Sequence, residues 1–261
     1  MTITAHELRQ GRLSFLIWTL SIGFLLAVCI FLYPEMKNEM DDISQLFASM
    51  GSFSAAFSMD RLDFGTLSGF YAIECGNILG LGGALYAALC AVNMLSKEEK
   101  EHTAEFLLTH PVSRVRVVTE KLLAIFLQIT AMNAILLATS AVSITCIEEE
   151  VIWKELLLLH LAYYLLQLEL AGICFGISAF LRKGSMGTGL GLAVILYFLN
   201  LIANLSESAR FLKYITPFGY CEGADLIADG SLDACKIAIG AVICLAGIAA
   251  AYLTYSKKDI L

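Results

Sequence analysis

Long apolar runs alternate with short polar intervals along the whole chain. Six of these runs reach about 20 residues or more, the length that an α-helix needs to cross the hydrocarbon core of a membrane. A helix suits that environment because it pairs its backbone N–H and C=O groups internally. The pattern therefore predicts an all-α polytopic membrane protein with six transmembrane helices, near residues 13–33, 67–95, 117–144, 152–181, 185–205 and 234–255.

Composition supports this prediction. Hydrophobic residues make up 58% of the 261 and charged residues only 16%, and the mean hydropathy is +0.75. These values exclude an ordinary soluble domain. The first apolar run is longer than the core of a usual signal peptide, and no small-residue cleavage site precedes Tyr33-Pro34-Glu35. We therefore expect the mature chain to keep this run as its first span.

Five of the eight cysteines lie inside apolar runs, where a free cysteine behaves as a small hydrophobic residue. The chain has no Cys-x-x-Cys pair and no Cys/His spacing typical of a metal ligand set. We interpret the cysteines as packing residues and predict no metal site. Pairing between two of Cys146, Cys221 and Cys235, which lie near one face of the membrane, stays open.

The basic residues predict the orientation of the chain. The intervals on one side of the predicted helices carry 11 of the 17 Lys and Arg residues, namely Arg9, Arg12, Lys97, Lys100, Arg114, Arg116, Lys121, Arg182, Lys183, Lys257 and Lys258. The intervals on the other side are acidic, as in Glu148-Glu149-Glu150. Lys and Arg concentrate in cytoplasmic segments. We therefore expect both termini in the cytoplasm, in agreement with an even number of spans.

Four polar residues inside the predicted spans are candidates for a substrate pathway. A carboxylate costs on the order of 2–4 kcal/mol at the centre of a bilayer unless it faces protein or water, so Glu74 and Glu169 stand out. Glu74 also suits the outer interface, and Glu169 suits a buried hydrogen bond as well as a substrate contact. Asn200 and Asn204 are four residues apart and so share one helix face, where they can equally join neighbouring helices.

Three pairs of glycines are spaced four residues apart within the spans: Gly76 and Gly80, Gly172 and Gly176, and Gly187 and Gly191. Glycines at this spacing let two helix backbones approach closely. The fifth run also contains Gly189, so we expect it to be a contact helix, with a second copy of the chain as a candidate partner.

The interval between the second and third spans, residues 96–114, is more ordered than a plain linker. Glu101 to Leu108 can form about two helical turns, and Pro111 ends that helix because it disfavours helical geometry at the residue before it. Ser113 then suits the N-cap of the next helix. On these grounds alone, the interval could equally be a short loop that only turns the chain.

The same interval resembles the signature of ABC-2 type transporter permeases. The matching residues are Glu98, Glu99, Thr103, Glu105, Leu107, Leu108, Pro111, Val112, Ser113, Arg114 and Lys121, while His102 departs from the usual Gly. Thr216-Pro217-Phe218-Gly219-Tyr220 resembles the Ser/Thr-Pro-Phe element of the family, and Tyr255–Ile260 resembles its basic-Asp ending. The resemblance covers nearly the whole chain in order.

The resemblance implies one permease domain over residues 1–261, without a nucleotide-binding domain. Such a subunit is not an enzyme: it docks two separate ABC ATP-binding subunits, which bind the ATP and Mg²⁺, and it pairs with a second copy or a homologous permease in the membrane. The sequence is consistent with this implication, since it has no GxxxxGK[ST] phosphate loop. We expect a multi-pass protein of a bacterial cytoplasmic membrane, with the lipid bilayer as its surroundings, no nucleic-acid partner and no catalytic residue.

By similarity, Glu101–Leu108 is the coupling helix that enters a cleft of the ATPase. The residues implied in coupling are Glu98, Glu101, Thr103, Glu105, Phe106, Leu107, Leu108, Pro111 and Arg114, with Glu105 and Arg114 as docking charges. The segment from Arg210 to Asp229 resembles the short outer re-entrant helices that close the pathway. Its residues alone indicate only a loop.

Two other classes of membrane protein fit the sequence less well. A membrane-embedded hydrolase is disfavoured because the chain contains neither HExxH nor GxSxG. A secondary transporter driven by an ion gradient would need intramembrane charge pairs and broken helices, and only Glu74 and Glu169 support it. We therefore predict an ABC permease, with export favoured by the resemblance, and keep the ion-gradient-driven transporter as the alternative.

Overall fold

A computed structural model describes residues 2–38, 50–100, 112–181 and 185–257, and the described residues contain helices and no strand. Six helical segments are long and apolar enough to cross a membrane, so the six predicted spans are confirmed. The spans are α1 (Thr2–Asn38), the consecutive helices α4 (Leu67–Cys75), η2 (Gly76–Leu81) and α5 (Gly82–Val92), then α8 (Arg114–Cys146), α9 (Trp153–Phe180), α10 (Met186–Leu205) and α12 (Ala234–Lys257).

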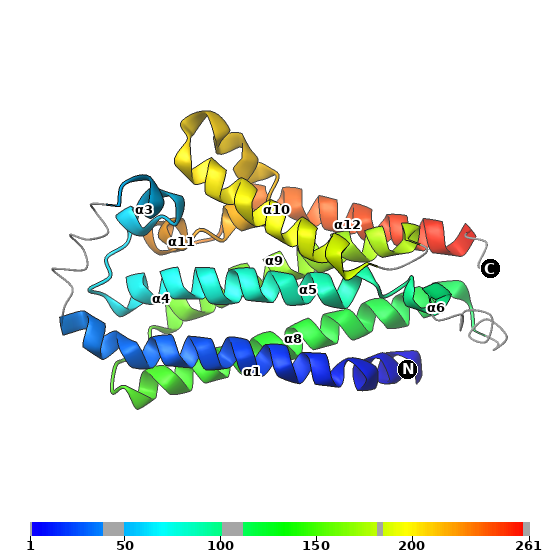
Figure 1. Cartoon of the computed structure of the whole chain (residues 1–261), viewed down its shortest axis with the longest axis horizontal. Coiled ribbons are helices and arrows are strands. Elements are labelled where there is room, and N and C mark those ends of the chain that lie inside the picture. Colours follow the sequence, from blue (N-terminus) through cyan, green and yellow to red (C-terminus); the bar gives the residue numbers. More distant parts are fainter. Residues whose placement is uncertain (1, 39–49, 101–111, 182–184, 258–261) are drawn as a thin grey trace.

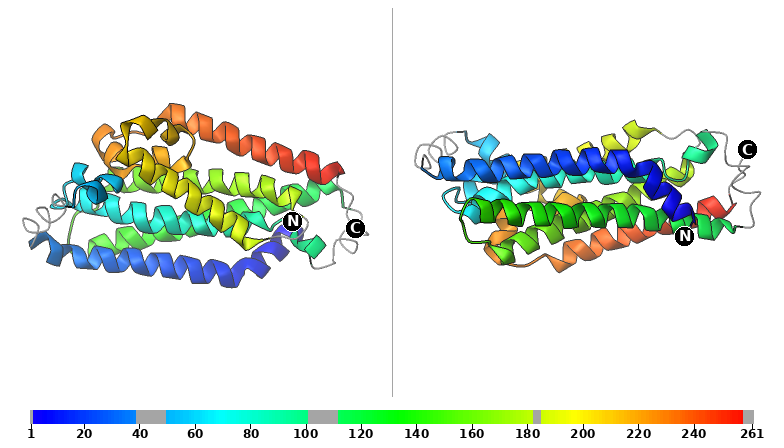
Figure 2. Two further views of the ribbon diagram at one scale, coloured as in Figure 1. Left: turned by 45° about the horizontal axis from the view of Figure 1, so that its top comes forward. Right: turned by 90° about the horizontal axis from the view of Figure 1, so that it is seen from below.

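The spans run side by side, and both ends of the chain lie at one end of the bundle (Figure 1). We call this the terminal end and the opposite one the distal end. Helix α9 is central, because it packs against α12, α5 and α8, while α1 packs mainly against α8. Helix α10 crosses the others obliquely and contacts α5 and the distal elements (Figures 1 and 2).

Large apolar side chains cover the outside of the bundle. Examples on α1, α10 and α12 are Leu20, Phe24, Ile195, Phe198, Val242 and Leu245, each more than half exposed. A soluble protein would bury such a surface, whereas lipid tails solvate it. The exposed side chains therefore support the same conclusion as the length of the spans.

The second span changes its winding in the middle, where residues 76–81 form a π-helix. The wider turn lies against the ring of Tyr163 from α9: a Cβ atom at Gly80 would come within 2.9 Å of its Cε1 atom, and one at Gly76 within 3.0 Å of its hydroxyl. The predicted close approach at this glycine pair is therefore present. Short π-helical segments occur frequently at functional sites, and this one lies beside the cavity described below.

Five short helices cover the distal end: α3 (Ser52–Ala56), η1 (Met59–Arg61), η3 (Glu207–Tyr214), η4 (Pro217–Tyr220) and α11 (Gly223–Asp229). Helix η4 starts at Thr216, whose hydroxyl accepts from the Phe218 N–H at 3.4 Å and donates to the Leu196 carbonyl of α10 at 2.8 Å. Pro217 fits the first turn because the N–H that it lacks has no helical partner there. The segment 217–223 is buried.

At the terminal end, α6 (Lys97–Lys100) leads into residues 101–111, which lie outside the described residues. The predicted coupling helix Glu101–Leu108 falls there, and with it Thr103, Glu105, Phe106, Leu107 and Pro111. Ser113 is the N-cap of α8, as predicted: its hydroxyl accepts from the Arg116 N–H at 3.3 Å.

Candidate functional site

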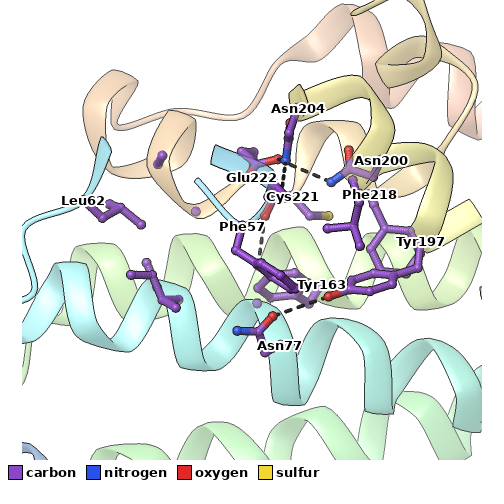
Figure 3. A pocket seen from close by; sticks show the side chains of 17 residues that line it. Phe57, Leu62, Asn77, Tyr163, Tyr197, Asn200, Asn204, Phe218, Cys221 and Glu222 are labelled. Carbon is purple, nitrogen blue, oxygen red and sulfur yellow. Dashed lines mark hydrogen bonds between the residues drawn. The ribbon is translucent and has the colours of Figure 1, made fainter. Parts of the chain in front are cut away.

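A small polar cavity of about 50 Å³ lies near the distal end, where the second span, α9, α10 and the short helices meet (Figure 3). Five polar side chains from α9, α10 and the second span line it: Asn77, Tyr163, Tyr197, Asn200 and Asn204. Glu222, just before α11, also lines it and is 9% exposed. The cavity therefore joins parts of the chain that are far apart in sequence around one buried carboxylate.

Glu222 is held from both sides. Its Oε2 atom accepts from the side-chain Nδ2 atoms of Asn204 at 3.0 Å and of Asn200 at 3.4 Å (Figure 3). The Nζ atom of Lys213 lies 3.8 Å from the same oxygen. Hydrogen bonds from amides and a nearby cation are what a buried carboxylate requires. The two asparagines reach the same atom because they lie one turn apart on α10.

Glu222 belongs to three consecutive residues that bind two different spans. The hydroxyl of Tyr163 on α9 donates to the Cys221 carbonyl at 2.9 Å, and the Cys221 thiol donates to the Ala162 carbonyl at 3.3 Å. The hydroxyl of Tyr220 donates to Oε2 of Glu169, also on α9, at 2.9 Å. Residues 220–222 therefore connect α9, through Tyr220 and Cys221, to α10, through Glu222.

The four pathway candidates do not form one group. Asn200 and Asn204 line the cavity, and Glu169 lies outside its lining but contacts the same segment through Tyr220. Glu74 faces α1 instead, where the Cys29 thiol lies 3.5 Å from its Oε2 atom. Glu222 lies in the segment from Arg210 to Asp229, whose residues alone indicated only a loop, so its burial was not predicted. The one available signal was its position four residues after Phe218 of the Thr-Pro-Phe element.

A second polar cluster, at the terminal end, centres on Lys121. The Lys121 side chain is 1% exposed, and its ammonium donates to the Met94 carbonyl at 2.7 Å, to Glu7 Oε1 at 3.0 Å and to the Glu98 carboxylate. Lys97 pairs with the other oxygen of Glu7. The lysine of the family signature is thus a buried cation shared between three parts of the chain.

The neighbouring Glu120 binds the start of α1. Its Oε2 atom accepts from the backbone N–H groups of Ile3 at 3.0 Å and Thr4 at 3.2 Å, and its Oε1 atom accepts from Arg116 at 2.9 Å. The first N–H groups of a helix have no partner within the helix and carry positive partial charge. A carboxylate from α8 therefore caps α1, which explains why α1 begins well before its apolar run.

Two predicted coupling residues have defined positions beside segment 101–111. Glu98 faces buried Lys121, so it holds α6 against α8. Arg114 donates from Nη1 to the carbonyl oxygens of Tyr255 and Ser256, both at 3.3 Å, at the end of α12. The residues on each side of the segment are therefore fixed to α8 and α12.

The family model described as ABC-2 family transporter protein matches residues 1–260. No curated protein matches the chain in a sequence comparison. Members of this family are membrane subunits that associate with separate ABC ATP-binding subunits. The family match, the six apolar helices and the Lys121 cluster of the signature agree with one another. The chain therefore belongs to the ABC-2 family of transporter proteins.

Proposed function

We propose that the chain is the permease subunit of an ABC exporter in a bacterial cytoplasmic membrane. Two ABC ATP-binding subunits dock at the terminal end, in the cytoplasm, and bind the ATP and Mg²⁺ that drive transport. A second copy of the chain, or a homologous permease, completes the membrane part. The family match supports the transporter class, while the direction of transport rests on the resemblance alone.

The observation that carries this proposal is the Lys121 cluster beside segment 101–111. Glu98 precedes the segment, Arg114 follows it, and Lys121 links both sides to Glu7 on α1. A push on the segment therefore reaches α1, α5, α8 and α12 together, because buried charge pairs resist separation. ATP favours the closed ATPase pair, and the segment passes that difference in free energy to the spans.

The distal cavity is the proposed gate of the pathway. Opening it requires residues 220–222 to leave either α9, through Tyr163 and Glu169, or α10, through Asn200 and Asn204. The bond from Tyr163 to the Cys221 carbonyl joins neutral groups and contributes about 0.5–1.5 kcal/mol net, and the bonds to the carboxylates of Glu169 and Glu222 contribute about 1.5–3 kcal/mol each when the carboxylate is charged. The substrate would pass along α10 and next to Glu222.

The alternative is a transporter driven by an ion gradient. One observation favours it: the carboxylates of Glu74 and Glu169 both lie within the spans, with a thiol and a phenol as their respective hydrogen-bond partners. Carboxylates at that depth serve as proton relays in some carriers. ATP-dependent transport by a reconstituted complex would contradict this alternative.

The test is to co-express the chain with an ABC ATPase whose gene adjoins its own and to purify through a tag on the permease. We expect the ATPase to remain bound, and the charge reversal Glu105→Arg to release it and lower ATP turnover. The matched control is Glu207→Arg, the same reversal at an exposed residue of the distal end. Equal retention by Glu105→Arg and the control would contradict the coupling role.

A further inference from the structure

The distal end also carries a larger hollow, of about 820 Å³, beside the ends of α10 and α12. Four basic side chains line it, Arg61, Arg210, Lys213 and Lys236, together with one carboxylate, Asp225. Asn204, which also lines the gate cavity, separates the two sites. The hollow is therefore distinct in its charge and open to the surface of the molecule.

Basic residues gather at this hollow, whereas the rest of the distal end is acidic. Besides the 11 Lys and Arg residues expected in the cytoplasm, the chain has six, namely Lys37, Arg61, Lys154, Arg210, Lys213 and Lys236. Four of these six line the one hollow. In a chain of net charge −7, whose intervals on this side are acidic, such a grouping creates a local positive potential.

The carboxylates nearby do not use all the donors of these cations. Arg61 pairs with Asp225 at 2.6 Å, and Lys236 pairs with Asp233 at 3.1 Å. The hydrogen bond from Lys236 holds the pKa of the Asp233 carboxyl below its usual value, so that pair stays charged at neutral pH. Arg61 and Lys236 therefore each have a close carboxylate, while Lys213 shares Glu222 and Asp225 at longer ion-pair distances.

Lys213 and Arg210 have N–H donors that no described residue accepts from. The ammonium of Lys213 is 3.8 Å from Glu222 and 4.0 Å from Asp225, beyond hydrogen-bond distance from each, and its side chain is only 15% exposed. Within the described residues no hydrogen bond or ion pair engages Arg210, which is exposed on the same helix, η3. Buried ammonium groups normally have acceptors, so the pair is ready to bind an anion.

The surroundings of the hollow suit the surface of a membrane. On η3 and directly after it, Phe211, Tyr214 and Ile215 are 61%, 50% and 49% exposed, next to the cations on the other face. A short helix with basic and apolar faces at the end of a span is typical of the lipid headgroup region. Arg and Lys together are suited to phosphate oxygens.

We propose that this hollow binds a phosphate group, with Arg210 and Lys213 as its donors. The group belongs either to the headgroup of an anionic lipid in the adjoining leaflet or to a free phosphate or phosphate ester in solution. The chemistry of recognition is the same for both. The proposal does not depend on the direction of transport or on the ATPase.

The experiment uses the full chain in nanodiscs of phosphatidylcholine, alone or with phosphatidylglycerol, and measures the midpoint of thermal unfolding. Inorganic phosphate is titrated separately into the phosphatidylcholine discs. A ligand that binds the folded state raises the midpoint. The test variant is Arg210→Gln/Lys213→Gln, and the control is Lys154→Gln, an exposed distal cation that does not line the hollow. Circular dichroism checks that each variant is folded.

We expect the wild type and Lys154→Gln to respond and the double variant to bind about tenfold more weakly or worse, as the loss of charge-assisted hydrogen bonds predicts. A response to phosphatidylglycerol identifies a lipid headgroup, and a response to inorganic phosphate alone identifies a soluble ligand. If the wild type responds to neither, or if the double variant responds as strongly as the wild type, the proposal is wrong.

Discussion

Lys121 is a buried charge whose three donors are all used. An ammonium group has three N–H bonds, and here they meet Met94, Glu7 and Glu98, from three different parts of the chain. Charge buried with full hydrogen bonding is tolerated, but removal of one partner leaves the others desolvated and unpaired. Loss of the Lys121 side chain is therefore costly mainly because it leaves the buried carboxylates of Glu7 and Glu98 without their partner.

We predict that Lys121→Met lowers the free energy of unfolding by about 3–5 kcal/mol, because it leaves the Glu98 carboxylate and part of the Glu7 carboxylate without a cation. Thermal unfolding in detergent would measure the change. Adding Glu7→Gln should recover part of the loss, whereas Lys154→Met alone should change the stability little. A melting curve of Lys121→Met that matches the wild type would show that the cluster does not stabilise the fold.

Glu169 and Tyr220 offer a second test at the scale of single residues. Tyr220→Phe removes the donor of a buried carboxylate, so we predict a loss of about 1–3 kcal/mol of stability. Replacing both partners with apolar residues, as Glu169→Met/Tyr220→Phe, should restore much of that loss, because no polar group is then left unpaired. A double variant less stable than Tyr220→Phe would contradict this account.

The sequence predicted that Glu169 is costly in a span, but it left open whether a hydrogen bond or a substrate satisfies it. The structure gives the hydrogen bond. Its donor lies 51 residues away in sequence, on a segment whose residues alone indicate a loop. This partner depends on how η4 folds back between the helices, which the hydrophobic pattern of the sequence does not predict.

Among the elements, the three glycine pairs have different surroundings. Gly172 and Gly176 lie against α12, where a Cβ atom at Gly176 would come within 2.6 Å of the Gly247 carbonyl oxygen. On α10, a Cβ atom at Gly191 would meet nothing within 4 Å, and one at Gly187 would meet only Ser185. The pair on α10 therefore presents a smooth surface that none of the described helices covers.

We predict that Gly176→Ala destabilises the protein by about 1–3 kcal/mol, because the added methyl group would force the α9 and α12 backbones apart. Gly191→Ala, the control, should be neutral or stabilising, since alanine favours the helix by up to about 1 kcal/mol. Unfolding by heat in the same detergent compares the two. Similar destabilisation by both changes would mean that the close α9–α12 contact is not the cause.

The open glycine face of α10 bears on the proposed second permease copy. If that copy packs there, a bulky side chain as in Gly191→Phe should reduce the dimer fraction, measured by light scattering in mild detergent. Leu245→Phe, on an exposed part of α12, provides a control for added bulk on the surface. An unchanged dimer fraction in Gly191→Phe would exclude this face as the interface.

The sequence predicted the six spans well, because apolar length is a direct requirement of the bilayer. It predicted their ends less well. Helix α1 begins at Thr2 and continues past Pro34 to Asn38, beyond the apolar run at both ends. Apolarity marks the hydrocarbon region, whereas the start of this helix depends on the carboxylate of Glu120 in another span. The π-helix at residues 76–81 also had no signal apart from its glycines.

The two ends of the whole molecule are held together differently. Buried ion pairs join the spans at the terminal end, around Lys121. At the distal end, residues 220–222 connect α9 and α10 mainly through hydrogen bonds to neutral side chains and backbone, and Glu222 provides the only buried carboxylate lining the cavity among the described residues. A conformational change therefore meets less resistance at the distal end, away from the proposed ATPase site.

We predict that ATP binding to the assembled transporter increases backbone hydrogen exchange in residues 207–229 and leaves residues 117–125 protected. The reason is that the gate contacts must break, while the Lys121 cluster transmits the motion intact. Mass spectrometry on the complex with and without a non-hydrolysed ATP analogue would compare them, with residues 129–136 of α8, which make none of the gate contacts, as an internal reference. Loss of protection around Lys121 without a change at 207–229 would contradict this prediction.

The family and the six-span architecture could be predicted for the whole molecule, since both depend on patterns that run along the chain. The gate cavity could not, because Asn77, Tyr163 and Glu222 meet only after four helices have packed. The role of the signature lysine was also hidden. Its position at the start of an apolar run gave no indication that three separate segments supply its acceptors.

The separation of Glu7 and Lys121 along the chain also sets an order for biogenesis. The two residues are 114 positions apart, so a ribosome makes the Glu7 carboxylate long before Lys121, and of its two cations Lys97 comes first. The start of the first helix must therefore wait, in water or at the membrane surface, until the third span begins to insert. Only then can Glu7 pair with Lys121, and a nascent chain that ends before residue 121 would lack this ion pair.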